Sequence, residues 1–257
     1  MLERGFAVRV ASWNIHRCIG GDGRRDPQRI IAAILSLDAD VVALQEAETP
    51  VKSAHSSTSL PLLGSLAEQG YQPVLGPTIL FDRHSYGNLL LTRLPVRRCE
   101  RVDLSRAGRE PRGLLDVSLE LGRATSDACN RFPLLRCLAT HLGLRRGERR
   151  AQFERILQQI DASGEVAGPS QPLVLLGDFN EWRQRNCRLA SIDAVLKPAP
   201  RKPSFSARWP LLALDRLWYR HAVLECYETV RTPLTRIASD HLPLLARLRI
   251  ARRGNGI

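Results

Sequence analysis

Short apolar runs of strand length recur along the whole chain, and segments of helical periodicity are interspersed among them. The sequence has no low-complexity tract, no long linker and no repeat of solenoid length. This pattern predicts a mixed α/β sandwich in one domain. We predict strands at residues 8–15, 40–46, 72–80, 88–92, 96–104, 113–121, 134–141, 172–177, 214–219, 222–229 and 242–250.

Capping residues and periodicity predict three helices. Asp26 can cap a helix over residues 26–37, with Pro27 in its first turn. A second helix is predicted over residues 59–69, and Pro61 restricts where it can start. The third is predicted from the i, i+3, i+4, i+7 spacing of Phe153, Ile156, Leu157 and Ile160.

The segments between these elements are predicted to be loops. Residues 122–133 are polar and rich in turn formers, which favours a hairpin loop, and residues 197–210 form a loop rich in Pro and Arg. We expect one domain over residues 1–257, with its core in 6–250 and a tail at 251–257. A chain of 257 residues can bury enough surface to fold without disulfides or structural metals.

The net charge is strongly positive and comes almost entirely from arginine. Lys plus Arg is 38 against 26 Asp plus Glu, a balance of +12, and the only lysines are Lys52, Lys197 and Lys202. Arginine stays charged and pairs with phosphate through two N–H groups, so its excess fits a nucleic acid or an anionic membrane surface as partner. Base composition of the gene is the alternative explanation. No obligate protein partner is evident.

The sequence also predicts a cellular location. The first residues contain neither the apolar segment nor the cleavage pattern of a secretory signal, and no window approaches 18 apolar residues. The six cysteines are scattered without a CxxC pair, as expected for free thiols in a reducing compartment. We therefore expect a cytoplasmic protein.

Polar side chains recur at the ends of otherwise apolar strands, where α/β sheets gather their ligand groups. They are Asn14, Glu46, His141, Asp178, Asn180, Asp215, Asp240 and His241, the last two predicted to open the final strand. Carboxylate and amide oxygens suit Mg²⁺ or Mn²⁺, and the lack of a Cys/His cluster argues against zinc. With two histidines and a spare carboxylate, these groups can support metal-assisted hydrolysis of a phosphoester.

The motifs around these residues resemble those of the endonuclease/exonuclease/phosphatase superfamily. They occur in its order over nearly the whole chain: Ser12-Trp-Asn-Ile-His16, Leu44-Gln-Glu46, Gly87-Asn88, Thr140-His-Leu142, Gly177-Asp-Phe-Asn180, Leu214-Asp-Arg-Leu-Trp218 and Ser239-Asp-His-Leu-Pro243. The resemblance implies a four-layer α/β sandwich of the deoxyribonuclease I type, in which two mixed β-sheets pack between helices. It also implies a divalent-metal-dependent hydrolase.

The resemblance also implies roles for individual residues. Glu46 is similar to the principal metal ligand, assisted by Asn14 and Asp240. Asp178 resembles the group that orients or deprotonates the attacking water, and Asn180 a donor to the phosphate. His241 resembles a histidine that a carboxylate orients, a role assigned to Asp215, and His141 one that contacts phosphate or protonates the leaving oxygen.

Three further residues are predicted to contact substrate, and two of them, Arg112 and Trp209, have a structural alternative. Asn88 belongs to a family motif that is weak when taken alone. Arg112 is either a phosphate contact or a surface arginine at a strand start. Trp209 lies in a basic loop and can stack on a base, enter a lipid interface, or simply anchor the loop.

The combined evidence predicts a phosphodiesterase that uses in-line attack by an activated water. Nucleic acid is slightly favoured as substrate because of the basic charge, and a phospholipid or small phosphodiester is the alternative. Abasic-site repair is disfavoured, since Glu181-Trp182 follows the Gly-Asp-Phe-Asn motif. A catalytically silent polyanion-binding protein is a remote alternative, because no residue of the predicted catalytic set is missing.

Overall fold

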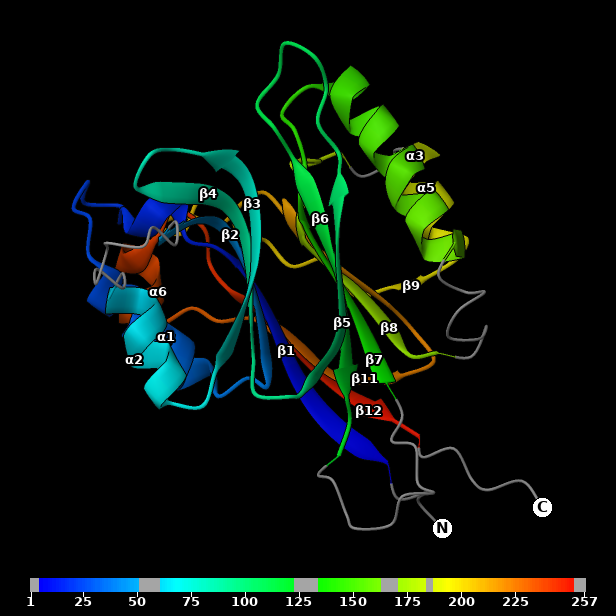
Figure 1. Ribbon diagram of the computed structural model, residues 1–257, viewed down its shortest axis with the longest axis horizontal. Coiled ribbons are helices and arrows are strands. Elements are labelled where there is room, and N and C mark those ends of the chain that lie inside the picture. The colour runs from blue at the N-terminus through cyan, green and yellow to red at the C-terminus, as the bar shows by residue number, and fades with distance from the viewer. Residues whose placement is uncertain (1–4, 51–60, 123–133, 163–170, 184–186, 252–257) are drawn as a thin grey trace.

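The computed structural model describes residues 5–50, 61–122, 134–162, 171–183 and 187–251. Two mixed β-sheets of six strands each pack face to face, and helices cover their outer faces (Figure 1). This arrangement confirms the predicted four-layer sandwich.

The first sheet has the strand order β11-β12-β1-β2-β4-β3, and the second has the order β5-β6-β7-β8-β10-β9. The strands of the first sheet are β1 (Phe6–Asn14), β2 (Val41–Pro50), β3 (Gln72–Leu80), β4 (His84–Thr92), β11 (Val223–Thr229) and β12 (Leu244–Ile250). Those of the second are β5 (Val96–Asp103), β6 (Gly113–Glu120), β7 (Leu134–His141), β8 (Leu173–Asp178), β9 (Lys197–Pro198) and β10 (Asp215–Arg220).

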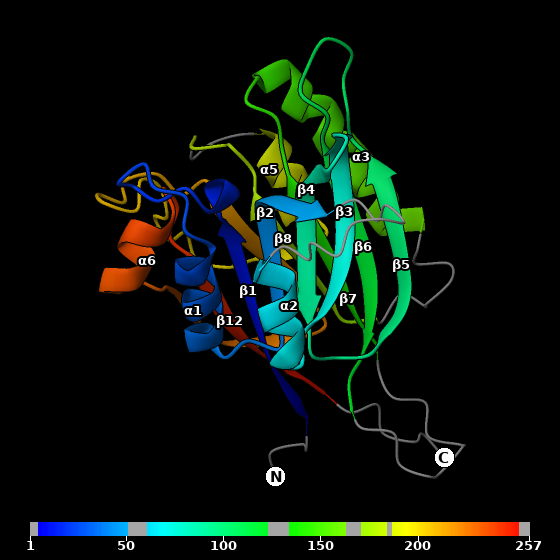
Figure 2. The same cartoon turned by 60° about the vertical axis from the view of Figure 1, so that its left-hand side comes forward.

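Helices α1 (Pro27–Leu37), α2 (Pro61–Glu68) and α6 (Pro233–Ala238) lie against the first sheet, as Figures 1 and 2 show. Helices α3 (Arg146–Ala162) and α5 (Cys187–Asp193) lie against the second, and a 3-10 turn, η1 (His16–Cys18), follows β1. Asp26 caps α1 as predicted, because its side chain accepts hydrogen bonds from the backbone N–H groups of Gln28 and Arg29.

Three buried hydrophobic clusters hold the four layers together. The central one lies between the sheets and includes Val10, Ala43, Val117 and Leu176, all fully buried. The second joins the first sheet to α1 and α2, and the third joins the second sheet to α3 and α5. Burial of apolar area on both sides of each sheet explains why its central strands are continuous apolar runs.

The strand register brings the polar strand ends together. The parallel strands β1 and β2 set Asn14 opposite Gln45, next to Glu46. The parallel strands β7 and β8 set His141 opposite Asp178, and antiparallel β10 sets Asp215 opposite Asp178 on the other side. The residues predicted to be catalytic therefore lie at one edge of the sandwich, and we call this edge the catalytic end.

The structure corrects several predicted boundaries. Helices α5 and α6 and the short strand β9 were not predicted, and β4 starts at His84 rather than at residue 88. Strand β12 starts at Leu244, so Asp240 and His241 precede the last strand and do not open it. The six residues of α6 are too few to show periodicity, although Thr232 forms a capping box with Thr235.

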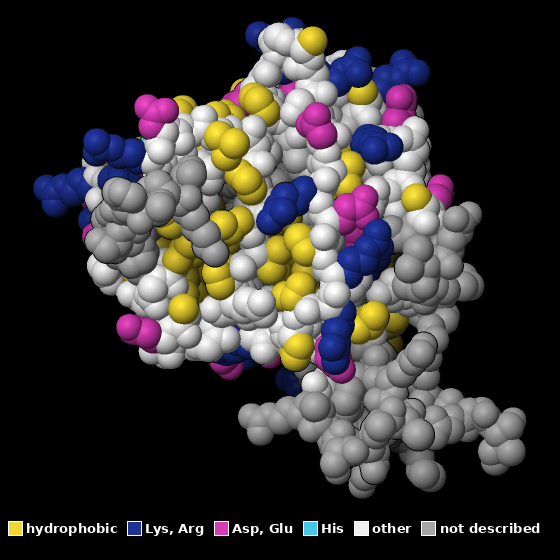
Figure 3. Space-filling model, viewed as in Figure 1, with side chains coloured by type: hydrophobic (Ala, Val, Ile, Leu, Met, Phe, Trp, Pro, Cys, Tyr) yellow, Lys and Arg dark blue, Asp and Glu magenta, His cyan; other side chains and the backbone are white. Residues whose placement is uncertain are grey.

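Some predictions fall outside the described residues. These include most of the hairpin loop predicted at 122–133, the start of the helix predicted at 59–69, and the tail beyond Ala251. In the part of the chain that the structure describes, no helix is both long and apolar enough to cross a membrane. On the face drawn in Figure 3, arginine side chains are widely spread, with exposed hydrophobic side chains between them.

Gly177 secures the register between β7 and β8. Its φ is +149°, and a Cβ at this position would lie 1.9 Å from the carbonyl oxygen of Thr140. We expect Gly177→Ala to lower the free energy of unfolding by at least about 2 kcal/mol, because backbone atoms must move to admit the methyl group. Urea unfolding measures this change.

Gly147→Ala is the matched control. Gly147 lies in α3, and an added Cβ there would meet nothing within 4 Å. Alanine favours a helix over glycine by about 1 kcal/mol, so this variant should be as stable as the wild type or more so. Equal unfolding curves for Gly177→Ala and the wild type would contradict the role given to Gly177.

Candidate active site

The carboxylate of Asp178 is at the centre of the site and is 1% exposed. Asn14 donates to its Oδ2 from Nδ2 at 3.1 Å, and the backbone N–H of Asn180 donates to its Oδ1 at 2.9 Å. The Nε2 atoms of His141 and His241 lie 3.6 and 3.7 Å from Oδ2. Five predicted residues therefore form one cluster at the junction of the two sheets, with Asn14 supplied by the first sheet.

Asn14 connects Asp178 to Glu46. Its Nδ2 also donates to Oε1 of Glu46 at 2.9 Å, while its Oδ1 accepts from the backbone N–H of His16 at 3.0 Å. Glu46 sits at an irregularity in the pairing of β2 with β4 and has a φ of +56°. This bulge re-aims the glutamate side chain toward the catalytic end, as bulges beside active sites commonly do.

His241 is oriented by Asp215, as predicted. Its Nδ1 lies 2.8 Å from Oδ2 of Asp215, and Ser204 donates to the same oxygen from Oγ at 2.5 Å. The ring of Phe205 packs against the imidazole, with ring centroids 4.9 Å apart. These contacts fix the ring so that Nε2 faces Asp178.

The charge on His241 is set by its carboxylate neighbours. Burial opposes protonation of the ring. The charge and hydrogen bond of Asp215, with the charges of Asp178 and Asp240, outweigh the effect of burial and raise the pKa of His241 to about 10. His241 is therefore an imidazolium at neutral pH.

The environment of His141, in contrast, favours the neutral imidazole. Burial, together with the charges of Arg112 and His241, outweighs the attraction of Asp178 and lowers the pKa of His141 to about 3. Nη1 of Arg112 lies 3.3 Å from its Nδ1, and Nδ2 of Asn180 lies 3.1 Å from its Nε2. Because both ring nitrogens face N–H groups, a second ring proton is disfavoured and the imidazole is neutral.

Arg112 is buried beside His141 and is not a surface side chain. Glu110 accepts from both of its terminal nitrogens, at 2.9 and 3.3 Å, and its Nε has no hydrogen-bond partner among the described residues. A buried guanidinium with an unused N–H group is a suitable donor to a phosphate oxygen. The predicted contact between Arg112 and phosphate stays a prediction.

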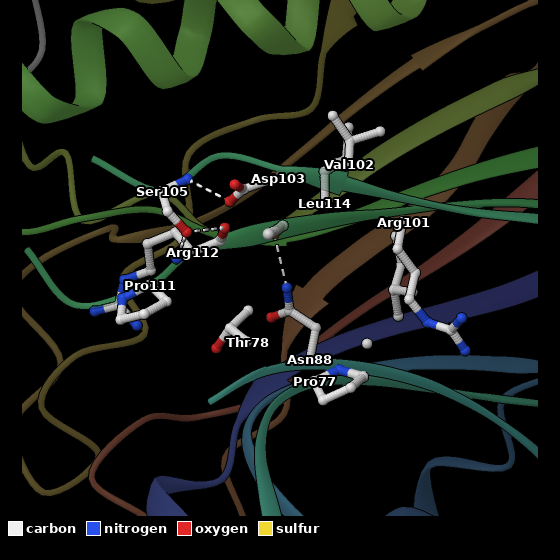
Figure 4. Close-up of a pocket in the computed structure, with 13 residues that line it drawn as sticks. Pro77, Thr78, Asn88, Arg101, Val102, Asp103, Ser105, Pro111, Arg112 and Leu114 are labelled. Atoms are coloured by element: carbon white, nitrogen blue, oxygen red, sulfur yellow. Dashed lines mark hydrogen bonds between the residues drawn. The ribbon is translucent and has the colours of Figure 1, made fainter. Parts of the chain in front are cut away.

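Asn88 lies across the sandwich from Arg112, in a cleft between the edges of the two sheets (Figure 4). Its Nδ2 donates to the carbonyl of Gly113 at 2.8 Å and so ties β4 to β6. The cleft has a volume of about 430 Å³, and its walls include Thr78, Asn88, Arg101 and Arg112. A substrate group extending from the cluster past Arg112 could enter it.

Asp240 and Trp209 lie at the border of the cluster. The Asp240 side chain is 38% exposed, lies 3.9 Å from Nδ1 of His16, and accepts a hydrogen bond from Ser239. Trp209, in the loop before β10, is 67% exposed. Its exposure excludes the packed loop anchor considered from the sequence, and its predicted contact with substrate stays a prediction.

Two sets of residues at this site could hold a metal ion. Asp178, Asp215 and His241 have ligand atoms within 4.8 Å of one another. However, the 2.8 Å bond between Asp215 and His241 already uses one ligand atom of each. Glu46 suits a divalent cation better, since its Oε2 has no hydrogen-bond partner among the described residues and carboxylate oxygens are preferred ligands of Mg²⁺.

Sequence reasoning missed several residues of the site. Ser204 and Glu110 hold the cluster through Asp215 and Arg112, and Ser239 donates to the carbonyl of Asn14 at 2.8 Å. Burial and the Glu46 carboxylate raise the pKa of Tyr86, which interacts with Arg112. Ser239 carried a signal because it precedes Asp240-His241 in a family motif, and Glu110 because it lies two residues before Arg112. Ser204 and Tyr86 come from a loop and from an adjacent strand.

A model of the Endonuclease/Exonuclease/phosphatase family matches residues 11–241, which include every residue of the cluster. The chain belongs to this family. Among curated relatives, the uncharacterized protein YbhP of Escherichia coli strain K12 is 28% identical over 265 residues, covering 95% of this chain and 97% of YbhP.

Solved structures of the family have the same fold. An endonuclease/exonuclease/phosphatase from Beutenbergia cavernae superposes with a TM-score of 0.75 at 23% identity, over 98% of this chain and 73% of that one. The catalytic domain of human Nocturnin, solved with a bound sulfate anion, gives a TM-score of 0.70 at 21% identity over 96% of each chain. The predicted family and fold are confirmed, and the family's members are phosphoester hydrolases.

Asp215→Asn should lower the pKa of His241, because it removes the carboxylate charge closest to the ring. The pKa of His241 is raised above its unfolded value of 6.5. Its stabilising contribution is therefore complete below pH 6.5 and disappears as the pH rises through about 10. NMR titration of the imidazole, assigned with His241→Gln, measures the shift in metal-free protein.

The same experiment has a stability readout. The unfolding free energy of the wild type should decrease between pH 7 and pH 10 more than that of Asp215→Asn. An unchanged His241 titration in Asp215→Asn would show that Asp215 does not control this histidine.

Proposed function

We propose that this protein is a divalent-metal-dependent phosphodiester hydrolase in which an activated water attacks phosphorus in line. The observation that carries the proposal is the Asp178 carboxylate set between a cationic and a neutral histidine. A carboxylate in this position can orient a water molecule and accept its proton. The flanking groups can stabilise the charge that develops on the phosphate.

Each side chain has a role that follows from its charge. His241, held as a cation by Asp215, would stabilise negative charge in the transition state. His141 is neutral, which favours the predicted contact with a phosphate oxygen over donation of a proton to the leaving oxygen. Asn180 and Arg112 would donate N–H groups to the phosphate from either side of His141.

Glu46 would hold the divalent cation, with Asn14 keeping its carboxylate in place and Asp240 near the same edge. When bound, the cation would supply a positive charge that polarises the phosphate. Mg²⁺ is the ion proposed, and Mn²⁺ has the same ligand preference. The free Oε2 of Glu46 supports this assignment.

Asp178→Asn and Glu46→Gln should each reduce hydrolysis of bis(p-nitrophenyl) phosphate by about 10²- to 10⁴-fold, because the first removes the base and the second a metal ligand. The assay uses Mg²⁺, with EDTA as a further arm that should abolish activity. Asp161→Asn, an exposed change on α3, is the matched control and should keep full activity. Activity that survives Asp178→Asn or EDTA would contradict the proposal.

The same assay can separate diesters from monoesters. Faster hydrolysis of p-nitrophenyl phosphate than of its bis-ester would assign the protein to the phosphatases. The basic charge favours nucleic acid as substrate, and nicking of supercoiled plasmid in Mg²⁺ tests this directly, with Asp178→Asn as control. The positions of the exposed hydrophobic side chains instead favour a phospholipid as the phosphodiester substrate.

A further inference from the structure

Exposed large hydrophobic side chains are concentrated at the catalytic end. Among the described residues ten such side chains are exposed, and eight of them lie in loops, in α6 or at the end of β3, on the side where Asn14 and Asp178 are found. The two exceptions, Val195 and Val223, lie near the opposite end of β10. Four of the eight are Leu80, the last residue of β3, and Phe81, Leu144 and Trp182 in the loops that follow β3, β7 and β8.

The other four form what we call the loop–helix patch: Trp209, Leu211 and Leu212 in the loop before β10, and Ile237 in α6. Their exposed fractions are 67%, 82%, 36% and 46%. The loop is ordered, because the backbone N–H groups of Leu211 and Leu212 both donate to the carbonyl of Phe205. The exposed side chains are thus presented by a fixed turn.

The loop–helix patch borders the active site. Of the four patch residues, Ile237 lines a pocket of about 600 Å³, together with Arg208 of the loop and with Asp240 at the border of the cluster. Phe205, at the base of the same loop, packs against His241. A surface that contacts the patch would therefore lie next to the catalytic residues.

The two segments that carry the patch are basic, while the pocket beside them also contains two carboxylates, Asp22 and Asp240. Residues 201–214 and 230–239 contain five cationic side chains and no carboxylate: Arg201, Lys202, Arg208, Arg231 and Arg236. Apolar side chains flanked by arginines complement a bilayer with anionic lipids, whose headgroups attract arginine and whose interior accepts leucine and tryptophan.

Nucleic acid fits this patch less well. Bases stack on aromatic rings, and Trp209 could serve that purpose. Leu211, Leu212 and Ile237 offer no stacking surface, and their exposure to water is unfavourable unless an apolar phase covers them.

We propose that the loop–helix patch docks the catalytic end onto an anionic bilayer, so that the phosphodiester cleaved is that of a phospholipid headgroup. This rests on the proposed hydrolase activity. The oxygen of water bonds to phosphorus as one water proton passes to Asp178, one P–O ester bond breaks, and the leaving alkoxide takes up a proton, so that one water is consumed overall. The products are an alcohol and a phosphomonoester.

Sedimentation with vesicles tests the docking. Vesicles of phosphatidylcholine, with or without phosphatidylglycerol, are mixed with the full chain in EDTA, which separates binding from hydrolysis. We expect the wild type to sediment with the phosphatidylglycerol vesicles. Leu211→Ser/Ile237→Ser should weaken binding about tenfold or more, because two exposed side chains lose their apolar contact with the bilayer.

Val223→Ser is the matched control, since Val223 is 62% exposed at the opposite end and should not affect binding. Arg208→Gln/Arg236→Gln should remove the preference for phosphatidylglycerol. Circular dichroism spectra confirm that each variant is folded. Blue-shifted tryptophan emission on binding, lost in Trp209→Phe, would place this residue in the interface.

Three results would overturn the inference: no sedimentation of the wild type, equal binding by Leu211→Ser/Ile237→Ser and Val223→Ser, or loss of oligonucleotide binding rather than vesicle binding in the patch variants. Hydrolysis of bis(p-nitrophenyl) phosphate by the wild type separates the two proposals. If it persists while vesicles are neither bound nor cleaved, the docking is wrong and the hydrolase activity stands. Release of a phosphomonoester from bound vesicles would support both.

Discussion

Burial of the Asp178 carboxylate is the constraint on which the rest of the site depends. A carboxylate that is 1% exposed is tolerated only where donors or positive charges surround it. Here the amide of Asn14 reaches it from the other sheet, the backbone of Asn180 turns back toward it, and two histidine rings face it. The buried charge of Asp178 is thus stabilised only when the two sheets pack together at the catalytic end.

The two histidines have opposite protonation states because different charged side chains contact them. Both rings are buried and both face Asp178, yet His241 is bonded to a carboxylate and His141 to a guanidinium. The first arrangement favours the imidazolium and the second the neutral ring. A pair of this kind supplies one cation and one neutral donor or acceptor at the same pH, which phosphodiester hydrolysis can use.

Strand ends could be predicted from the sequence because an apolar run that stops at a polar residue is a local signal. Asn14, Glu46, His141 and Asp178 were found in this way, as was the Asp26 cap. Helix α6 and the exact start of β12 were missed, since short elements are defined by tertiary contacts rather than by periodicity. Ser204 and Tyr86 were missed for a related reason, because nothing in the sequence near them marks them as partners of distant residues.

Apolar periodicity in the sequence predicted the mixed α/β class, and motifs read along the chain predicted the family, the four-layer fold and the candidate site residues. Tertiary structure alone decided that Arg112 is buried against His141, that Asn14 serves two carboxylates at once, and that the two histidines differ in charge. It also decided where exposed leucines and arginines gather. Burial, pKa and surface patches are properties of neighbours in space, and those neighbours are up to 228 residues apart in the chain.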